Sequence, residues 1–345
     1  MRVAVTGGGS GGHLFPALAV GEELARRGHE VFFVGGDGLE ARVVPGRLPF
    51  YPIATGKLDR GRPRPGELLR AGKGLLQGLA LAGRLRPRVV FATGGYASLP
   101  FALAASLRGS RLFIHEQNAQ LGLANRILAE RAQEVLLAVP ADLPLRVAVK
   151  SRVVGMPVRE ERYPAAEARR RLGLDPDLPT LLVLGGSQGA RALNQRLPRL
   201  LEPFLDRLQV LHQTGERWLE ETASLVSHPR YHLAGFLDAA LAWSAADLAV
   251  TRAGAMTLAE IAFHRVPAIL VPYPYSAGGH QRRNAGLYAS RGAALMVEEE
   301  ELDSLPEKLA ALLDPKTREG MRRALVEFDP KGSTRRIADL LEEAA

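Results

Sequence analysis

The sequence contains no cysteine, which excludes disulfides, thiolate metal ligands and a cysteine nucleophile. It also lacks an apolar run of about 18 residues, the length that spans a bilayer, and a leader in which basic residues precede an apolar segment. We therefore expect a soluble globular protein that stays in the cytoplasm. Lysine is scarce as well, because only 6 of the 45 basic residues are lysine and 39 are arginine.

Positive charge is concentrated in the first half of the chain. Residues 1–158 contain 21 Lys+Arg against 11 Asp+Glu, whereas residues 159–345 contain 24 against 26. Aromatic residues make up only 6% of the chain and do not alternate with these basic residues. This pattern favours an anionic surface or ligand, with membrane headgroups as natural a partner as nucleic acid. Solubility alone is the alternative explanation.

Short apolar runs alternate with helix-length segments along the chain, whose 345 residues exceed one usual hydrophobic core. Alternation of this kind predicts an α/β fold with parallel strands and crossover helices, a doubly wound sheet. The pattern restarts after residue 159, which predicts two similar domains with a cleft between them as the default site. The expected strands are Arg2–Thr6, Val31–Val34, Val89–Ala92, Leu112–His115, Val135–Val139, Thr180–Leu184, Gln209–Gln213, Tyr231–Leu233, Leu248–Thr251 and Ala268–Val271.

The most glycine-rich stretch is Gly7–His13, G-G-G-S-G-G-H, directly after the first expected strand. Without side chains, the backbone N–H groups of this turn and of the following helix can face one concavity and bind an anion or a sugar. His13 is its only titratable residue and a candidate base. Gly7, Gly9 and Gly12 also satisfy G-x-G-x-x-G, and Asp37 lies where a dehydrogenase would bind ribose. A dinucleotide dehydrogenase and a purely structural turn therefore stay open at this point.

Two further loops follow strands of the first half. T-G-G-Y at Thr93–Tyr96 offers a second backbone nest, and H-E-Q-N at His115–Asn118 places four hydrogen-bonding side chains at a strand end. Because such groups are costly to bury, we expect them to line a wet cleft rather than a core. The segment Glu67–Arg88, which lies between the first glycine loop and T-G-G-Y, is rich in leucine, glycine and arginine. That segment is either a helix on an anionic bilayer or a crossover helix of the fold.

The second half begins with an expected linker over residues 151–179, followed by a strand and the glycine turn G-G-S-Q-G-A at Gly185–Ala190. The Ser187 hydroxyl and neighbouring N–H groups suit a phosphate oxygen, and Arg159 offers a charge-assisted contact. Later, Gly254 opens a helix at Ala255–Thr257, and Glu260 is expected within about one turn of that end, where it can accept both hydroxyls of a ribose.

Taken together, these motifs resemble the MurG family of N-acetylglucosaminyltransferases over essentially the whole chain. The family's order is G-G-G-S-G-G-H, T-G-G-Y, H-E-Q-N, G-M-P-V-R, G-G-S-Q-G-A and R-A-G-A-M-T-L-A-E, and all six occur here in that order. The resemblance implies a GT-B fold: an acceptor and membrane-associating domain at residues 1–157 with a returning helix at 331–345, and a UDP-sugar domain at 158–330. It also implies attachment to the cytoplasmic face of the plasma membrane, with no nucleic acid partner and no cofactor.

The resemblance further implies site residues of three kinds. The catalytic candidates are His13 and Glu116, and the acceptor contacts are Gly94, Gly95 and Tyr96. The UDP-N-acetylglucosamine contacts are Ser10, Gly11, Gly12, Asn118, Arg159, Ser187, Gln188, Phe236, Leu237, Ala255, Met256, Thr257, Leu258, Ala259, Glu260, His280 and Gln281. Where some members have two adjacent glutamines this chain has His280-Gln281, which leaves open the sugar hydroxyl that each binds.

The expected reaction is an inverting transfer of N-acetylglucosamine to the 4-hydroxyl of undecaprenyl-diphospho-muramoyl-pentapeptide. The sequence has no D-x-D motif, so a metal-independent enzyme is expected, with protein donors stabilising the leaving diphosphate. Three alternatives remain: transfer to another membrane lipid such as diacylglycerol, a non-catalytic sugar-binding protein, and the dehydrogenase.

Overall fold

Two units make up the chain in the computed structural model, which describes residues 1–56, 65–118, 120–141, 143–276 and 279–344. Unit 1 comprises Met1–Arg159 with Pro330–Ala345, and unit 2 comprises Glu160–Asp329. The boundaries expected from the sequence were 157/158 and 330/331, so Arg159 lies in unit 1 rather than in the unit expected to bind the UDP-sugar. Ala277 and Gly278 lie outside the described residues.

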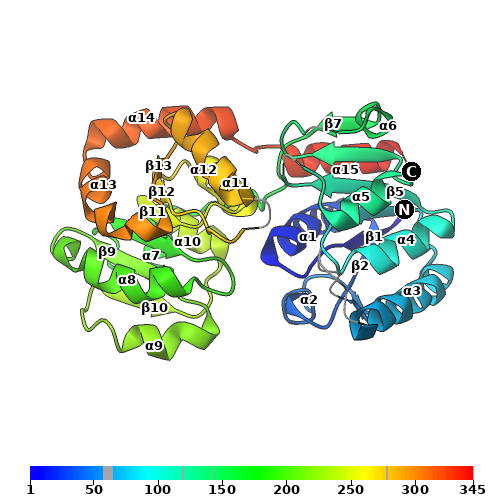
Figure 1. Ribbon diagram of the computed structural model, residues 1–345, viewed down its shortest axis with the longest axis horizontal. Coiled ribbons are helices and arrows are strands. Elements are labelled where there is room, and N and C mark those ends of the chain that lie inside the picture. The colour runs from blue at the N-terminus through cyan, green and yellow to red at the C-terminus, as the bar shows by residue number, and fades with distance from the viewer. Residues whose placement is uncertain (57–64, 119, 142, 277–278, 345) are drawn as a thin grey trace. The chain divides into compact units, whose positions relative to one another are not determined.

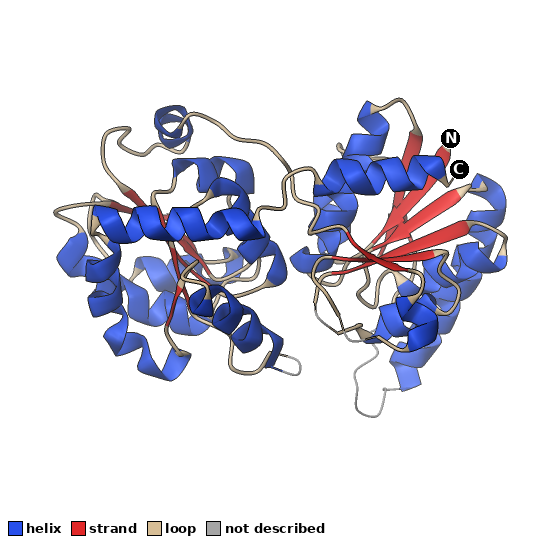
Figure 2. Cartoon of the chain, turned by 90° about the horizontal axis from the view of Figure 1, so that it is seen from above, coloured by secondary structure: helices blue, strands red, loops and turns tan. Residues whose placement is uncertain are grey.

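Unit 1 is built on a parallel seven-stranded sheet of order β3-β2-β1-β4-β5-β6-β7, seen with its helices in Figures 1 and 2. Its strands are β1 Arg2–Thr6, β2 Glu30–Gly35, β3 Phe50–Pro52, β4 Val89–Ala92, β5 Arg111–Glu116, β6 Glu134–Leu137 and β7 Ser151–Val153. Its helices are α1 Gly11–Arg26, α2 Leu39–Val43, α3 Pro65–Leu85, α4 Leu99–Leu107, α5 Leu123–Ala129, α6 Leu145–Ala148 and α15 Ser333–Glu343.

Both faces of this sheet are buried, because alternate strand residues enter two separate apolar cores. Ala4, Val90 and Ile114 pack with residues of α3, α4 and α5 on one face. Val3, Phe33 and Phe91 pack with α1 and with α15 on the other. Burial on both faces requires the near-continuous apolar runs seen in the sequence. The carboxyl ends of the strands then lie at one edge, where the loops of interest emerge.

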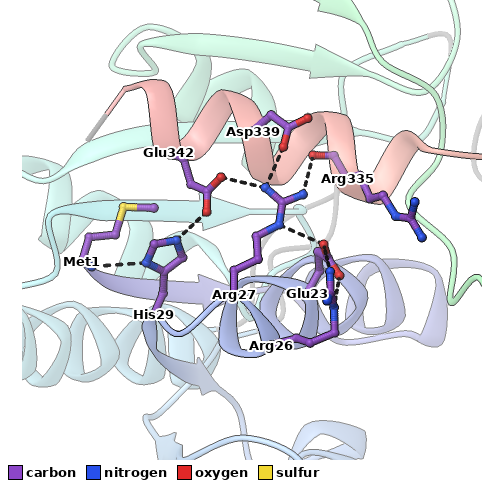
Figure 3. A network of polar contacts seen from close by, with 8 residues as sticks. All are labelled: Met1, Glu23, Arg26, Arg27, His29, Arg335, Asp339 and Glu342. Carbon is purple, nitrogen blue, oxygen red and sulfur yellow. Dashed lines mark hydrogen bonds and ion pairs between the residues drawn. The ribbon is translucent and has the colours of Figure 1, made fainter.

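Helix α15 returns from the end of the chain to cover unit 1, and appears red among blue and green elements in Figure 1. Its inner face contributes Ile337, Ala338 and Leu341 to the core. At its edge, the Arg27 guanidinium contacts Glu23 at 2.9 Å, Asp339 at 2.6 Å and Glu342 at 2.7 Å (Figure 3). His29 Nε2 lies 2.6 Å from Glu342, and its Nδ1 lies 3.3 Å from the Met1 amino group. Ion pairs of Arg27 therefore join α15 to the end of α1, and a hydrogen bond joins Glu342 of α15 to His29, the residue before β2.

Two of the five glycines of α3 are explained by close packing, one against Ala54 and one against α4. A Cβ on Gly74 would lie 1.9 Å from the Ala54 carbonyl oxygen, and one on Gly78 would lie 3.0 Å from Ala104 Cβ. The helix therefore packs through its small residues, and its leucines need not all face inward. Leu68, Leu69 and Leu76 are 50%, 77% and 70% exposed.

Unit 2 has a parallel six-stranded sheet of order β10-β9-β8-β11-β12-β13 around one apolar core. The predicted α/β fold with two doubly wound parallel sheets is thereby confirmed. The strands are β8 Thr180–Leu184, β9 Gln209–Gln213, β10 Tyr231–Ala234, β11 Leu248–Thr251, β12 Ala268–Leu270 and β13 Leu295–Met296. The helices are α7 Ala165–Arg171, α8 Arg191–Leu201, α9 Leu219–Ala223, α10 Ala239–Ala245, α11 Ala255–His264, α12 His280–Ser290, α13 Leu305–Leu312 and α14 Pro315–Leu325, with 3₁₀ turns at Glu202–Phe204, Glu216–Trp218, Glu299–Ser304 and Val326–Phe328.

The expected linker over residues 151–179 is wrong, because it contains ordered elements of both units. Ser151–Val153 forms β7, the edge strand of unit 1. Helix α7 packs against α10, and its Arg169 is only 8% exposed. That guanidinium donates to Asp247 at 2.6 Å and to the Ala245 carbonyl at 3.1 Å. This segment is rich in proline and charged residues, so its sequence does not indicate the buried ion pair between Arg169 and Asp247 that holds the start of unit 2 in place.

Candidate functional site

Three loops of unit 1 follow neighbouring strands β1, β4 and β5 and come into direct contact. A Cβ on Gly95 would lie 2.0 Å from the Gly8 carbonyl oxygen, and one on Gly9 would lie 2.4 Å from the Tyr96 ring. Gly9 and Gly95 have φ of +81° and +77°, a region that other residues rarely adopt. The glycines are therefore required by close approach of the loops as well as by backbone conformation.

His13 lies at the centre of this contact and is partly exposed. Its Nδ1 is 3.0 Å from two acceptors, the Thr93 carbonyl oxygen and Gln117 Oε1. Gln117 Nε2 itself donates to the Thr93 oxygen at 2.7 Å, which fixes the orientation of the amide. With only acceptors around it, Nδ1 must carry the hydrogen, so Nε2 has the lone pair. In the neutral ring, Nε2 is therefore the nitrogen that can accept a hydrogen bond or a proton.

The carboxylate of Glu116 is 1% exposed and accepts four hydrogen bonds. Asn118 donates to Oε1 through its backbone N–H at 3.1 Å and its Nδ2 at 3.2 Å, while Gly122 N and Asn125 Nδ2 donate to Oε2, each at 2.9 Å. These bonds fold the loop after β5 around the carboxylate. Asn118, at the tip, remains partly exposed.

The expectation that H-E-Q-N lines a wet cleft is wrong for three of its four residues. His115, Glu116 and Gln117 are 0%, 1% and 4% exposed. Each is compensated by hydrogen bonds; His115 Nε2 pairs with the Gly155 carbonyl oxygen at 3.0 Å. Burial lowers the pKa of His115 to about 4, so this imidazole is neutral at physiological pH. The motif is mainly a support for the loops.

The amino end of α1 presents backbone donors without a side-chain cap. Ser10 is the N-cap residue in extended conformation, its hydroxyl makes no cap bond, and the first turn contains no acid. A Cβ on Gly12 would meet only the Ser10 hydroxyl oxygen, at 3.8 Å. Gly11 and Gly12 therefore expose a helix end that carries partial positive charge and suits an anion or a polar sugar.

In unit 2 the glycine loop after β8 rests on the end of β9. A Cβ on Gly189 would lie 1.6 Å from the Thr214 carbonyl oxygen, and one on Gly215 would lie 2.5 Å from that of Gln188. Ser187 is partly exposed and Gln188 is exposed. Phe236 and Leu237, after β10, are 48% and 9% exposed. The loop thus presents Ser187 and Gln188 outward while Gly189 packs against the residue after β9.

Sequence reasoning missed Gln213, which joins these two loops. Its Nε2 donates to the Gly186 carbonyl oxygen at 3.1 Å and its Oε1 accepts from Leu237 N at 2.9 Å. In the sequence Gln213 is only one of three polar residues in the strand QVLHQ. A strand-end glutamine was not distinguishable from a surface residue without the sheet order.

Helix α11 begins at Ala255 after the uncapped Gly254, as the sequence indicated. Glu260, however, is not within the first turn: five residues beyond Ala255, it lies in the second turn, about 7.5 Å along the axis. Ala255, Met256 and Thr257 are partly exposed at the helix end, whereas Leu258 and Ala259 are buried.

The Glu260 carboxyl lies in an unusual setting for an acid. It belongs to a partly exposed residue and accepts a hydrogen bond from Trp243 Nε1 at 3.0 Å. Burial raises its pKa to about 7, although the Trp243 bond opposes the shift. It therefore exchanges its proton near neutral pH.

Gln281, at the start of α12, bridges the loops after β11 and β12. Its Oε1 accepts from Ala253 N at 3.2 Å and from Tyr273 N at 2.9 Å. Only its Nε2 hydrogens can then be offered to a ligand. His280 is partly exposed beside it, and Arg159 is exposed in unit 1. Arg252, the buried residue directly after β11, donates to the Val271 carbonyl at 3.2 Å and pairs with Glu299.

Within the described residues, no group of three His, Asp or Glu side chains is arranged to hold a metal ion. Among those same residues, no helix has both the length and the apolar character needed to cross a bilayer.

Comparison with known proteins identifies the family. The model of the glycosyltransferase family 28 N-terminal domain matches residues 3–137, and that of the C-terminal domain matches residues 180–336. A Thermus thermophilus protein named UDP-N-acetylglucosamine–N-acetylmuramyl-(pentapeptide) pyrophosphoryl-undecaprenol N-acetylglucosamine transferase is 53% identical over 99% of both chains. The chain belongs to glycosyltransferase family 28. A family 28 relative of the same name from Deinococcus radiodurans is 42% identical, over 99% of this chain and 95% of its own.

A solved family 28 structure, MurG of Acinetobacter baumannii, superposes with a TM-score of 0.73 at 29% identity, covering 99% of this chain and 100% of the other. Membership in family 28 removes the dinucleotide dehydrogenase alternative. The acid on which that alternative depended, Asp37, is 78% exposed and pairs with Arg70 at 3.2 Å.

Proposed function

We propose that this protein transfers N-acetylglucosamine from UDP-N-acetylglucosamine to the 4-hydroxyl of undecaprenyl-diphospho-muramoyl-pentapeptide, a step of peptidoglycan synthesis. The observation that carries the proposal is the 53% identity, over nearly the whole of both chains, to a relative named for this transfer. The loop geometry supports it, because both sheets end in glycine-rich turns next to uncapped helix ends.

The donor nucleotide binds unit 2. The uracil contacts Phe236 and Leu237, the ribose hydroxyls donate to Glu260, and the diphosphate lies against Ser187, Gln188 and the amino end of α11. Arg159 adds a charge-assisted contact. In unit 2 the proposed sugar contacts are Gln281 and His280. In unit 1 they are Asn118 and, at the amino end of α1, Ser10, Gly11 and Gly12.

The chemistry is a displacement with inversion. The acceptor hydroxyl oxygen attacks the anomeric carbon, the bond from that carbon to the diphosphate oxygen breaks, and the electron pair leaves with UDP. His13 Nε2 takes the hydroxyl proton, because its tautomer leaves the lone pair there. Charge on the leaving diphosphate is stabilised by Arg159, Ser187 and the helix end at Ala255–Thr257, with no metal required.

Glu116 is the second candidate for the base, but its carboxylate already accepts four hydrogen bonds. We assign it instead to holding Asn118 toward the donor sugar. Gly94, Gly95 and Tyr96 contact the acceptor. Burial, with a contribution from Glu40, raises the pKa of Tyr96, so its hydroxyl is a donor at neutral pH.

Unit 1 attaches to the anionic cytoplasmic face of the plasma membrane. Support comes from the positive charge of the first half of the chain and from Leu68, Leu69 and Leu76, which project from α3 near Arg70 and Lys73. Apolar side chains flanked by cations are the composition that binds anionic lipid surfaces.

The deciding experiment is a UDP-release assay with UDP-N-acetylglucosamine and either the lipid-linked muramoyl-pentapeptide or diacylglycerol as acceptor. We expect UDP release and a disaccharide product with the first acceptor only. Release with diacylglycerol instead would assign the protein to another membrane-lipid transfer. Thermal protection by UDP-N-acetylglucosamine without UDP release would make it a sugar-binding protein.

A further inference from the structure

Three buried polar residues lie at the end of β9, at the centre of unit 2. They are His212 and Gln213, the last two residues of the strand, and Thr214, which follows it. Because β9 lies between β10 and β8, its end is flanked by the glycine loop after β8 and by Phe236–Leu237 after β10. These are the two segments proposed to bind the diphosphate and the uracil.

Gln213 joins the two segments through opposite ends of one amide. Its Nε2 donates to the Gly186 carbonyl oxygen at 3.1 Å, and its Oε1 accepts from Leu237 N at 2.9 Å. The side chain is 6% exposed, so water does not compete well for either bond. Only an amide offers a donor and an acceptor at this size; glutamate has acceptors alone, and methionine has no N–H or O–H donor.

Thr214 is held by a buried chain of hydrogen bonds whose direction is fixed. Asn194 Nδ2 donates to the Thr214 carbonyl at 2.8 Å, so Asn194 Oδ1 accepts from His212 Nε2 at 3.0 Å. His212 Nδ1 then accepts from the Tyr231 hydroxyl, also at 3.0 Å. Burial lowers the pKa of His212 to about 3, which keeps the ring neutral as this chain requires.

The glycine loop rests on this support. The Gly189 backbone packs against the Thr214 carbonyl, and Gly215, with φ of +82°, packs against the Gln188 carbonyl. The end of β9 therefore sets the height of the loop above the sheet, and Gln213 sets its distance from Leu237.

We propose that Gln213 is a positioning residue that fixes the spacing between the diphosphate loop, Gly185–Gly189, and the uracil segment, Phe236–Leu237. The inference rests on the proposed function and deepens it. Nucleoside diphosphates that span both segments gain affinity from this spacing, whereas a nucleoside that reaches only Phe236–Leu237 does not.

The test compares Gln213→Met and Gln213→Glu with the matched control Gln209→Met. Gln209 is in the same strand and 1% exposed, but it hydrogen-bonds Asp175 and Thr180 at the opposite end of β9. Dissociation constants of uridine and UDP are measured by calorimetry for each folded variant, with thermal midpoints recorded alongside.

In Gln213→Met the ratio of the uridine Kd to the UDP Kd should fall roughly tenfold, which is the effect of losing about one well-made hydrogen bond. Gln213→Glu should lose the same advantage while uridine affinity stays within about twofold of wild type, because its carboxylate still accepts from Leu237 N. Gln209→Met should keep the wild-type ratio even if its thermal midpoint drops. In turnover, the Gln213 variants should raise KM for the UDP-sugar and leave KM for the acceptor unchanged.

An unchanged ratio in both Gln213 variants, or an equal fall in the control, overturns the inference, because a merely structural role weakens both ligands by one factor. If Gln213→Met does not fold, Gln213→Glu against Gln209→Glu makes the same comparison. Absence of UDP binding in the wild type would instead contradict the proposed function.

Discussion

His13 and Glu116 both lie at the carboxyl edge of the first sheet, but their hydrogen bonds leave them different atoms to offer. The imidazole uses Nδ1 internally and keeps Nε2 as an acceptor. The carboxylate uses both oxygens on Asn118, Gly122 and Asn125. At neutral pH a base needs a lone pair directed at the substrate, so the geometry favours the imidazole.

His13→Ala should therefore lower kcat by about 10²–10⁴-fold, the usual contribution of general base catalysis, with little change in KM for the donor. Glu116→Ala should instead raise KM for the UDP-sugar through the displaced Asn118. Steady-state kinetics with both substrates varied distinguishes the two. Turnover of His13→Ala within a few-fold of wild type, together with collapse of Glu116→Ala, would reverse the assignment.

Glu260 predicts a pH dependence of donor binding. Its pKa of about 7 means that the carboxylate, the form that accepts the ribose hydroxyls, increases as pH rises from 6 to 8. We expect affinity for UDP-N-acetylglucosamine, whose diphosphate does not titrate in this range, to rise over that interval. Glu260→Gln should bind more weakly at pH 8 and show a flat profile. A wild-type profile that is equally flat would separate Glu260 from the ribose.

Glu260 also makes the stability of the fold depend on pH, and here the dependence is opposite, because stability falls as pH rises. Its pKa is raised in the folded protein above an ordinary value of 4.5, so its contribution to stability is complete below pH 4.5 and is lost as pH rises through about 7. The glutamine variant should lack this component in denaturation curves recorded at several pH values.

At the scale of elements, apolar runs in the sequence located the central strands, whereas short strands at the sheet edges could not be located. The bounds of β4, β8 and β11 follow from the sequence, because a parallel strand buried on both faces is largely apolar. Strand β9 was located as well, although three of its five residues are polar. Strands β3, β7 and β13 were missed, since two or three residues at a sheet edge carry no such run. Glycine turns located the loops, but the buried bonds of Gln213 and Glu116 depend on strand order, which composition does not encode.

The ion pairs that join α15 to α1 give a prediction at this scale. The Arg27 side chain is only 20% exposed, and its guanidinium contacts three carboxylates. Arg27→Met removes all three contacts and should lower the free energy of unfolding by about 1–2 kcal/mol. Hydrogen bonds from Arg26 and Arg27 hold the pKa of Glu23 at about 2, so this stabilisation exists above pH 4.5 and is lost toward pH 2.

Urea denaturation of both arginine variants measures the effect. The control is Arg26→Met, which removes a 69% exposed partner of the same Glu23 and should cost less. Equal losses in the two variants would show that the contacts of Arg27 with α15 contribute nothing.

At the scale of the whole molecule, charge differs between the halves of the chain while the fold repeats. Both units have doubly wound parallel sheets, yet the excess positive charge lies in residues 1–158. This difference in charge fits the proposed function, in which unit 1 binds a lipid-linked acceptor and unit 2 binds a soluble nucleotide.

Binding to lipid vesicles should follow from this asymmetry. We expect cosedimentation with vesicles containing anionic phospholipid, weakening as salt shortens the screening length from about 10 Å at 0.1 M to about 3 Å at 1 M. Leu69→Ser with Leu76→Ser should reduce binding several-fold further, because both side chains are mostly exposed on α3. Leu225→Ser, at a 48% exposed leucine of unit 2, is the control and should bind like wild type.

Helix α15 has a consequence for how the protein is made. Residues 333–343 leave the ribosome only after all of unit 2 has been synthesised, yet Ile337, Ala338 and Leu341 complete the core of unit 1. During translation, part of one apolar face of the first sheet therefore stays uncovered until α15 has been made, whereas unit 2 already has every residue it needs. Order of synthesis and order of completion are reversed in this chain.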